Sequence, residues 1–65
     1  MTKNKIREKR VAVGLSQVQL GFLSRVPNSV ISDFELGKRS PWPKAREALA
    51  RVLKIPEAEL FPLEE

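Results

Sequence analysis

The chain has 65 residues, among them twelve Lys and Arg, eight Asp and Glu, and no His or Cys. Without His or Cys it cannot form disulfides, thiolate or imidazole metal sites, or nucleophile–base pairs that use those side chains. A chain of this length buries one small core and leaves little room for an enclosed substrate pocket. We therefore expect a single domain over residues 1–65 that works through its surface, with no enzymatic activity, cofactor, metal or small-molecule ligand.

Charge is distributed unevenly along the chain. Residues 1–56 carry all twelve basic and four acidic residues, a net charge of +8, whereas residues 57–65 carry four Glu and no basic residue. This asymmetry favours contact with a polyanion, with the C-terminal end turned away from it, although a charged surface that only maintains solubility is the alternative. No apolar run is long enough to span a membrane, and a cytoplasmic location is expected.

The pattern of apolar and turn residues predicts an all-α fold of five helices, because no segment alternates strictly between apolar and polar residues. The first helix is expected from about Asn4 to Val13. It places Ile6 and Arg10 on one face with Val13, and Gly14 ends it with a left-handed cap.

The second helix is predicted over about residues 16–24. Ser16 and Gln19 stand three apart at its start, the spacing of a capping box. Pro27 lacks a backbone N–H group and restricts Val26 before it, so the helix ends ahead of them. The residues expected to face inward are Leu20 and Leu23.

The third helix is predicted over about residues 28–36 and ends at Gly37. Its start is open to two interpretations: Asn28 caps it with its side chain, or Pro27 is its first helical residue. The short connection after the second helix has the length found in helix-turn-helix motifs. A fourth helix is expected over about residues 43–53, after a basic, proline-rich loop. A fifth, short helix follows Pro56 and ends at Leu60-Phe61, so the predicted architecture is a compact set of five helices.

Together these landmarks resemble the lambda-repressor-like helix-turn-helix family, also called the Cro or XRE type, and the resemblance extends from about Ile6 to Phe61. Two positions depart from the family pattern. Gly21 replaces the usual Ala, which costs roughly 1 kcal/mol of helix propensity but still permits close approach of the helices. Arg25 replaces the usual Gly of the turn. The turn must then accommodate a side chain, and one way to do so is to adopt another backbone conformation. The matching residues are Gly14-Leu15-Ser16-Gln17, Leu20, Val26, Ile31-Ser32, Glu35, Gly37-Lys38-Arg39 and Pro41.

The resemblance implies that the chain binds double-stranded DNA, with the third helix in the major groove and the second helix across the backbone. An Asn side chain can form two hydrogen bonds with adenine, at N6 and N7. A Ser hydroxyl can form hydrogen bonds with several bases, and an Asp carboxylate can accept a hydrogen bond from the N4 amine of cytosine. For Asp33 the alternatives are exposure to solvent or pairing with a nearby Lys or Arg, because phosphates repel its carboxylate. By family position, the base-reading residues are Asn28, Ser29, Ser32 and Asp33.

The predicted recognition helix contains no Lys or Arg, so neighbouring segments must supply the electrostatic affinity for DNA. An ordinary solvated surface is the alternative for these side chains. The residues expected to bind phosphate are Gln17, Arg25, Lys38, Arg39 and Lys44.

Five further residues are interpreted in the context of this resemblance. In the family an Arg on the first helix pairs with the Glu near the end of the recognition helix, which implies a structural ion pair between Arg10 and Glu35. Trp42 is expected to pack over the core beside the fourth helix, with contact to DNA as the alternative. Phe22 either completes the core or, together with Val18, forms a surface for a partner.

The function implied is that of a sequence-specific transcriptional regulator, and in particular a repressor. One module of this type covers little DNA, so we expect a homodimer on a palindromic operator. The alternative is a protein-interaction module of the same fold, similar to antitoxins or antagonists, which acts on a protein partner. The candidate dimer contacts are Leu60, Phe61 and Leu63, although Leu60 and Phe61 are equally suited to complete the core of one chain.

Overall fold

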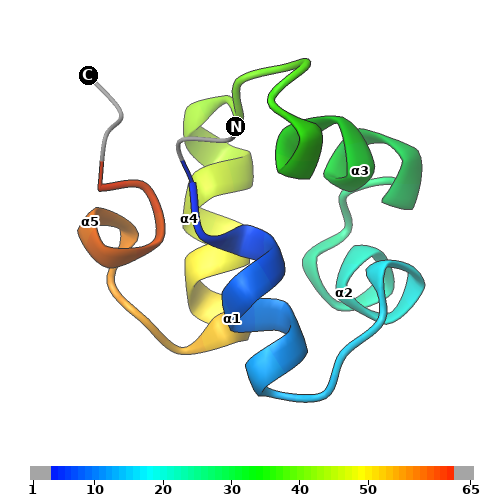
Figure 1. Cartoon of the computed structure of the whole chain (residues 1–65), viewed down its shortest axis with the longest axis horizontal. Coiled ribbons are helices and arrows are strands. Elements are labelled where there is room, and N and C mark those ends of the chain that lie inside the picture. Colours follow the sequence, from blue (N-terminus) through cyan, green and yellow to red (C-terminus); the bar gives the residue numbers. More distant parts are fainter. Residues whose placement is uncertain (1–3, 63–65) are drawn as a thin grey trace.

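The computed structural model describes residues 4–62, and within them the fold is all-α with five helices, as predicted. In Figure 1, α4 and α1 occupy the middle of the molecule, α5 lies on one side of them, and α2 and α3 lie on the other. None of the helices in this range is long and apolar enough to cross a membrane. The helices are α1 (Ile6–Ala12), α2 (Gln17–Ser24), α3 (Asn28–Leu36), α4 (Pro43–Leu53) and α5 (Glu57–Leu60).

Helix α2 begins with the predicted capping box. The Ser16 hydroxyl accepts a hydrogen bond from the backbone N–H of Gln19 at 3.0 Å, and the Gln19 side-chain oxygen accepts one from the backbone N–H of Ser16 at 2.8 Å. The start of α3 differs from both predictions. Pro27 is extended (φ −54°, ψ 139°) and precedes the helix, and Asn28 is the first helical residue, so its side chain caps nothing. Asn28 is therefore available on the surface.

Left-handed residues follow four of the helices, and two of these residues are glycines. Gly14, with φ 78°, lies just after α1, as predicted. Gly37 ends α3 with φ 78°, whereas Arg25 ends α2 with φ 62° and Lys54 ends α4 with φ 60°. Arg25 thus adopts the conformation that a glycine would adopt at the same position. Left-handed geometry is unfavourable for residues with a Cβ atom, so the turn between α2 and α3 contains local strain.

All five helices contribute to a single core. Its large side chains are inaccessible to solvent, and Trp42 covers one edge of it by packing edge to face on Phe34, with ring centroids 5.6 Å apart. Trp42 itself remains half-exposed. The fully buried large residues are Ile6, Leu20, Ile31, Phe34, Leu49 and Leu60.

Leu23 is not part of this core, which corrects the expectation that it faces inward. The inner face of α2 consists of Leu20, Gly21 and Ser24, so Leu23 lies beyond its edge. Gly21 has no Cβ atom, and this allows the backbone of α2 to pack closely against the turn that leads into the next helix. A Cβ atom at this position would lie only 2.7 Å from the carbonyl oxygen of Val26.

Two of the three candidate dimer contacts are core residues, which was the alternative expected for them. Leu60 and Phe61 are 0% and 3% exposed, and the carbonyl of Leu60 accepts a hydrogen bond from the backbone N–H of Lys5 at 2.9 Å. The Arg46 guanidinium covers the Phe61 ring at 5.5 Å from its centroid. These side chains close the core of one chain and cannot contact a second one. The third candidate, Leu63, lies outside the described residues.

Candidate nucleic-acid interface

Helix α3 has a buried side and an accessible side. Ile31 and Phe34 fix the helix to the core through the buried side. The accessible side is polar over its first two turns, with one carboxylate and no cation, and ends at Leu36, which is 61% exposed. We refer to its polar part as the α3 edge. Its exposed members lie at the start of the helix, and its half-buried members lie one turn further on. The α3 edge consists of Asn28, Ser29, Ser32 and Asp33.

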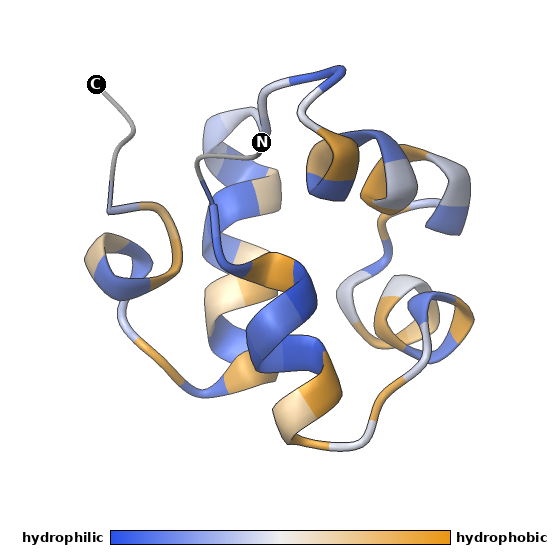
Figure 2. Cartoon of the chain, viewed as in Figure 1, coloured by the Kyte–Doolittle hydropathy of each residue, from blue (hydrophilic) through white to orange (hydrophobic). Residues whose placement is uncertain are grey.

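The basic loop that follows α3 folds back against this edge. The backbone N–H of Lys38 donates to the carbonyl oxygen of Asp33 at 2.9 Å, and the Nε atom of Arg39 lies 3.7 Å from the carboxylate of Asp33. Lys38 and Arg39 are both exposed, and Figure 2 shows a strongly hydrophilic part in this connection between α3 and α4. Two cations therefore lie beside a helix that has none.

A buried ion pair joins α1 to α3. Arg10 donates to the Glu35 carboxylate from Nε at 2.8 Å and from Nη2 at 3.2 Å, and the Glu35 side chain is only 4% exposed. The hydrogen bond to Glu35 raises the pKa of Arg10 above its ordinary value, against the opposing effect of burial. Arg10 also donates to the carbonyl of Leu15 at 2.9 Å, so the guanidinium fixes the connection that leads into α2.

Gln17 belongs to the same network. Its side-chain nitrogen donates to the Glu35 carboxylate at 3.0 Å, so α1, α2 and α3 meet at one carboxylate. The prediction assigned Gln17 to phosphate and did not foresee this bond. A signal was present, because a buried carboxylate needs several donors and Gln17 begins the helix next to it.

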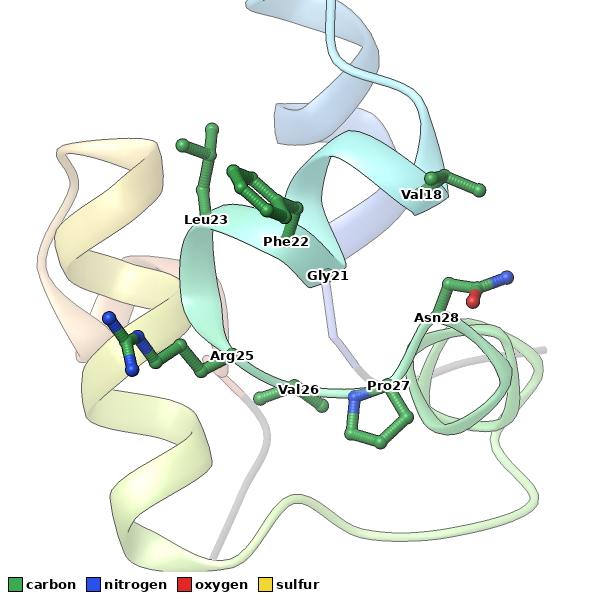
Figure 3. Close-up of a pocket in the computed structure, with 8 residues that line it drawn as sticks. All are labelled: Val18, Gly21, Phe22, Leu23, Arg25, Val26, Pro27 and Asn28. Atoms are coloured by element: carbon green, nitrogen blue, oxygen red, sulfur yellow. The ribbon is translucent and has the colours of Figure 1, made fainter.

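Arg25 and Lys44 lie apart from the α3 edge. In Figure 3, Arg25 extends toward α4, whereas Asn28 lies at the opposite end of the displayed segment. Arg25 and Lys44 line a hollow of about 300 Å³ between the turn and α4, together with Arg51 and one carboxylate, Glu47. The structure thus separates the predicted phosphate-binding cations into two groups, one beside α3 and one beside α4.

In a comparison with known protein families, a helix-turn-helix family model matches residues 6–60. The chain belongs to this helix-turn-helix family. Its members are DNA-binding regulators, and the match covers all five helices. Neither the comparison with curated proteins nor the comparison with solved structures finds a match. In this helix-turn-helix protein, α2 and α3 form the two-helix unit, joined by the turn at Arg25.

Proposed function

We propose that this protein is a sequence-specific transcriptional repressor that inserts α3 into the major groove of its operator. The observation that carries the proposal is the α3 edge, which is polar and accessible while the opposite side of the same helix is anchored in the core. A helix must expose its side chains in this way to reach base edges. The proposed base-reading residues are Asn28, Ser29, Ser32 and Asp33.

Phosphate binding is assigned to the loop after α3, to the start of α4 and to the start of α2. Lys38 and Arg39 bind one strand from the loop, and Lys44 binds at the start of α4. At the start of α2, the capping box uses the backbone N–H groups of Ser16 and Gln19. The N–H groups of Gln17 and Val18 lie between them and are proposed to bind phosphate, because helix N-termini favour anions. Arg25 is left out of this assignment because it points toward α4.

Two copies are proposed to occupy two half-sites of a palindromic operator. Because one small module buries only about 600–1,000 Å² on DNA, useful specificity requires a second one about ten base pairs away. Repression then follows from occupancy of the operator. The buried Leu60 and Phe61 take no part in contact between the copies.

Selection of binding sites from random duplex DNA tests this proposal. We expect a preferred half-site for the unmodified protein. Asn28→Ala and Asp33→Ala should each relax the preference at particular base positions, whereas Lys38→Ala should weaken binding to all sites to a similar extent. Val11→Ser, an exposed position on α1, serves as the control and should change neither property.

Two results would contradict the assignment. The first is a similar response to all three substitutions, because reading and anchoring roles would then not be separate. The second is no binding to any duplex at about 50 mM salt, where electrostatic attraction to phosphate is strong.

A further inference from the structure

Helix α2 presents an apolar surface to solvent that the DNA-binding proposal does not use. Val18, Phe22 and Leu23 are 63%, 84% and 53% exposed, and we call these three residues the α2 patch. Phe22 thus leaves most of its ring in water, although a buried phenylalanine stabilises a small domain. Contiguous exposed apolar side chains of this size mark interaction surfaces.

The α2 patch borders two hollows in the surface. One, of about 430 Å³, is lined by the patch together with Leu15 and Gln19. The other, of about 680 Å³, extends from the patch past Arg25 and Pro27 to the start of α3, and Figure 3 shows its lining residues. These hollows can receive side chains from a partner.

Arg25 is the one charged residue among those that line the two hollows of the α2 patch. No residue of α2 is charged, and neither hollow is lined by an acidic residue. Arg25 stands at the end of the larger hollow and also lines the hollow beside α4, where Lys44 and Arg51 lie with a single carboxylate, Glu47. An apolar surface therefore continues directly into a cationic one.

We infer that the α2 patch binds a partner protein through an acidic amphipathic helix. Apolar side chains of that helix fill the hollows around Phe22, and its carboxylates face Arg25 and Arg51. Aromatic and arginine side chains are the residue types that contribute most to such interfaces. This inference goes beyond the proposed function and does not depend on it, because the three apolar residues of the patch are not base-reading residues, although the larger hollow extends to Asn28, which is one.

A second copy of the chain fits the patch less well. A symmetric contact through α2 would bring the two Arg25 side chains near each other, with no carboxylate from either α2 or the linings of its hollows to compensate. DNA also fits the patch poorly, because the side chains of Phe22 and Leu23 have no hydrogen-bond donor or positive charge for a phosphate. Charge complementarity therefore favours an acidic protein segment.

The test is selection from a displayed library of helical peptides, each of about 15 residues or four turns, against the purified protein. We expect the selected peptides to combine Leu, Phe or Trp with Glu or Asp on one face. Phe22→Ser should weaken their binding about ten-fold or more, and Val18→Ser should act in the same direction. Val11→Ser removes a comparably exposed apolar side chain outside the patch and should leave binding unchanged.

Three outcomes would overturn the inference. One is that no selected peptide depends on Phe22 or Val18, and another is that the dependent peptides carry no acidic residues. The third is sedimentation showing a dimer that Phe22→Ser dissociates, which would assign the patch to a second copy.

A gel-shift measurement separates this result from the proposed function. Phe22→Ser should bind duplex DNA as the unmodified protein does. Loss of DNA binding by a variant that retains its helical circular dichroism would place the patch in the DNA interface and contradict the inference. Failure of the unmodified protein to bind DNA would contradict the proposed function alone.

Discussion

Arg25 and Lys54 occupy left-handed positions at the ends of α2 and α4, with φ angles of 62° and 60°. For residues with a Cβ atom this conformation costs roughly 1–2 kcal/mol, and glycine avoids most of that cost. Replacing either residue by glycine should therefore relieve strain that the fold itself imposes.

We expect Arg25→Gly to raise the free energy of unfolding by about 1 kcal/mol, as measured by urea denaturation. Lys54→Gly is the matched control, because it makes the same backbone change at the end of another helix. Stabilisation by Lys54→Gly together with destabilisation by Arg25→Gly would contradict this expectation, since it would show that the Arg25 side chain supports the turn.

At the scale of elements, α3 is held in place by one carboxylate that serves two other helices. Glu35 accepts hydrogen bonds from Arg10 of α1 and from Gln17 of α2. Removal of one partner of a buried pair leaves an uncompensated charge, whereas exposed pairs contribute little. The orientation of α3 thus depends on a contact that lies far from its reading side.

Arg10→Met should lower the free energy of unfolding by about 3–5 kcal/mol, because Glu35 then retains only Gln17 as a donor. Thermal or urea denaturation measures the loss. Lys9→Met is the control: Lys9 pairs with Glu59 at 3.1 Å on the surface, and its removal should cost less than about 1 kcal/mol. Equal losses in the two variants would show that burial does not strengthen the Arg10 pair.

At the scale of the whole molecule, base reading and electrostatic attraction are assigned to different segments. The α3 edge has no cation, and the nearest two, Lys38 and Arg39, belong to the following loop. Ionic strength should therefore act on the loop contacts and leave the order of preferred sequences unchanged.

The logarithm of the binding constant should fall with the logarithm of salt concentration with a slope of about −4 per protomer, for about four phosphate contacts. Lys38→Ala should reduce the magnitude of this slope by about 1, as measured by fluorescence anisotropy across a salt series. Lys54→Gly removes a positive charge at the other end of α4 and should leave the slope unchanged. A slope that does not respond to Lys38→Ala would remove that residue from the phosphate contacts.

The fold was predictable where local chemistry determines it. The capping box at Ser16 and Gln19 is confirmed, and the expected bounds of the fourth helix, residues 43–53, agree with α4. Local chemistry did not predict the exposure of Leu23, because a helix of only two turns buries a single narrow face against the core. Gly21 and Ser24 occupy that face, which periodicity alone does not reveal.

The candidate site was predictable only in part. The α3 edge lies on the surface at Asn28 and Ser29, whereas its role as the reading side remains a prediction. For Gln17 the sequence held one signal, the need of a buried Glu35 carboxylate for several donors, but the bond itself depends on packing between distant segments. The direction of Arg25 toward α4 depends on such packing too, and no sequence signal indicated it. The same limitation applies to Phe22, whose exposure was one of two open alternatives.

The contact at Gly21 determines how the two-helix unit can change over evolutionary time. The site of its absent Cβ atom lies 2.7 Å from one main-chain atom, the carbonyl oxygen of Val26, and 3.2 Å from another, the nitrogen of Asn28. A side chain at this position would meet main-chain atoms, which cannot move aside as the end of a flexible side chain can. Any replacement of Gly21 would therefore force α3 and the turn before it away from α2.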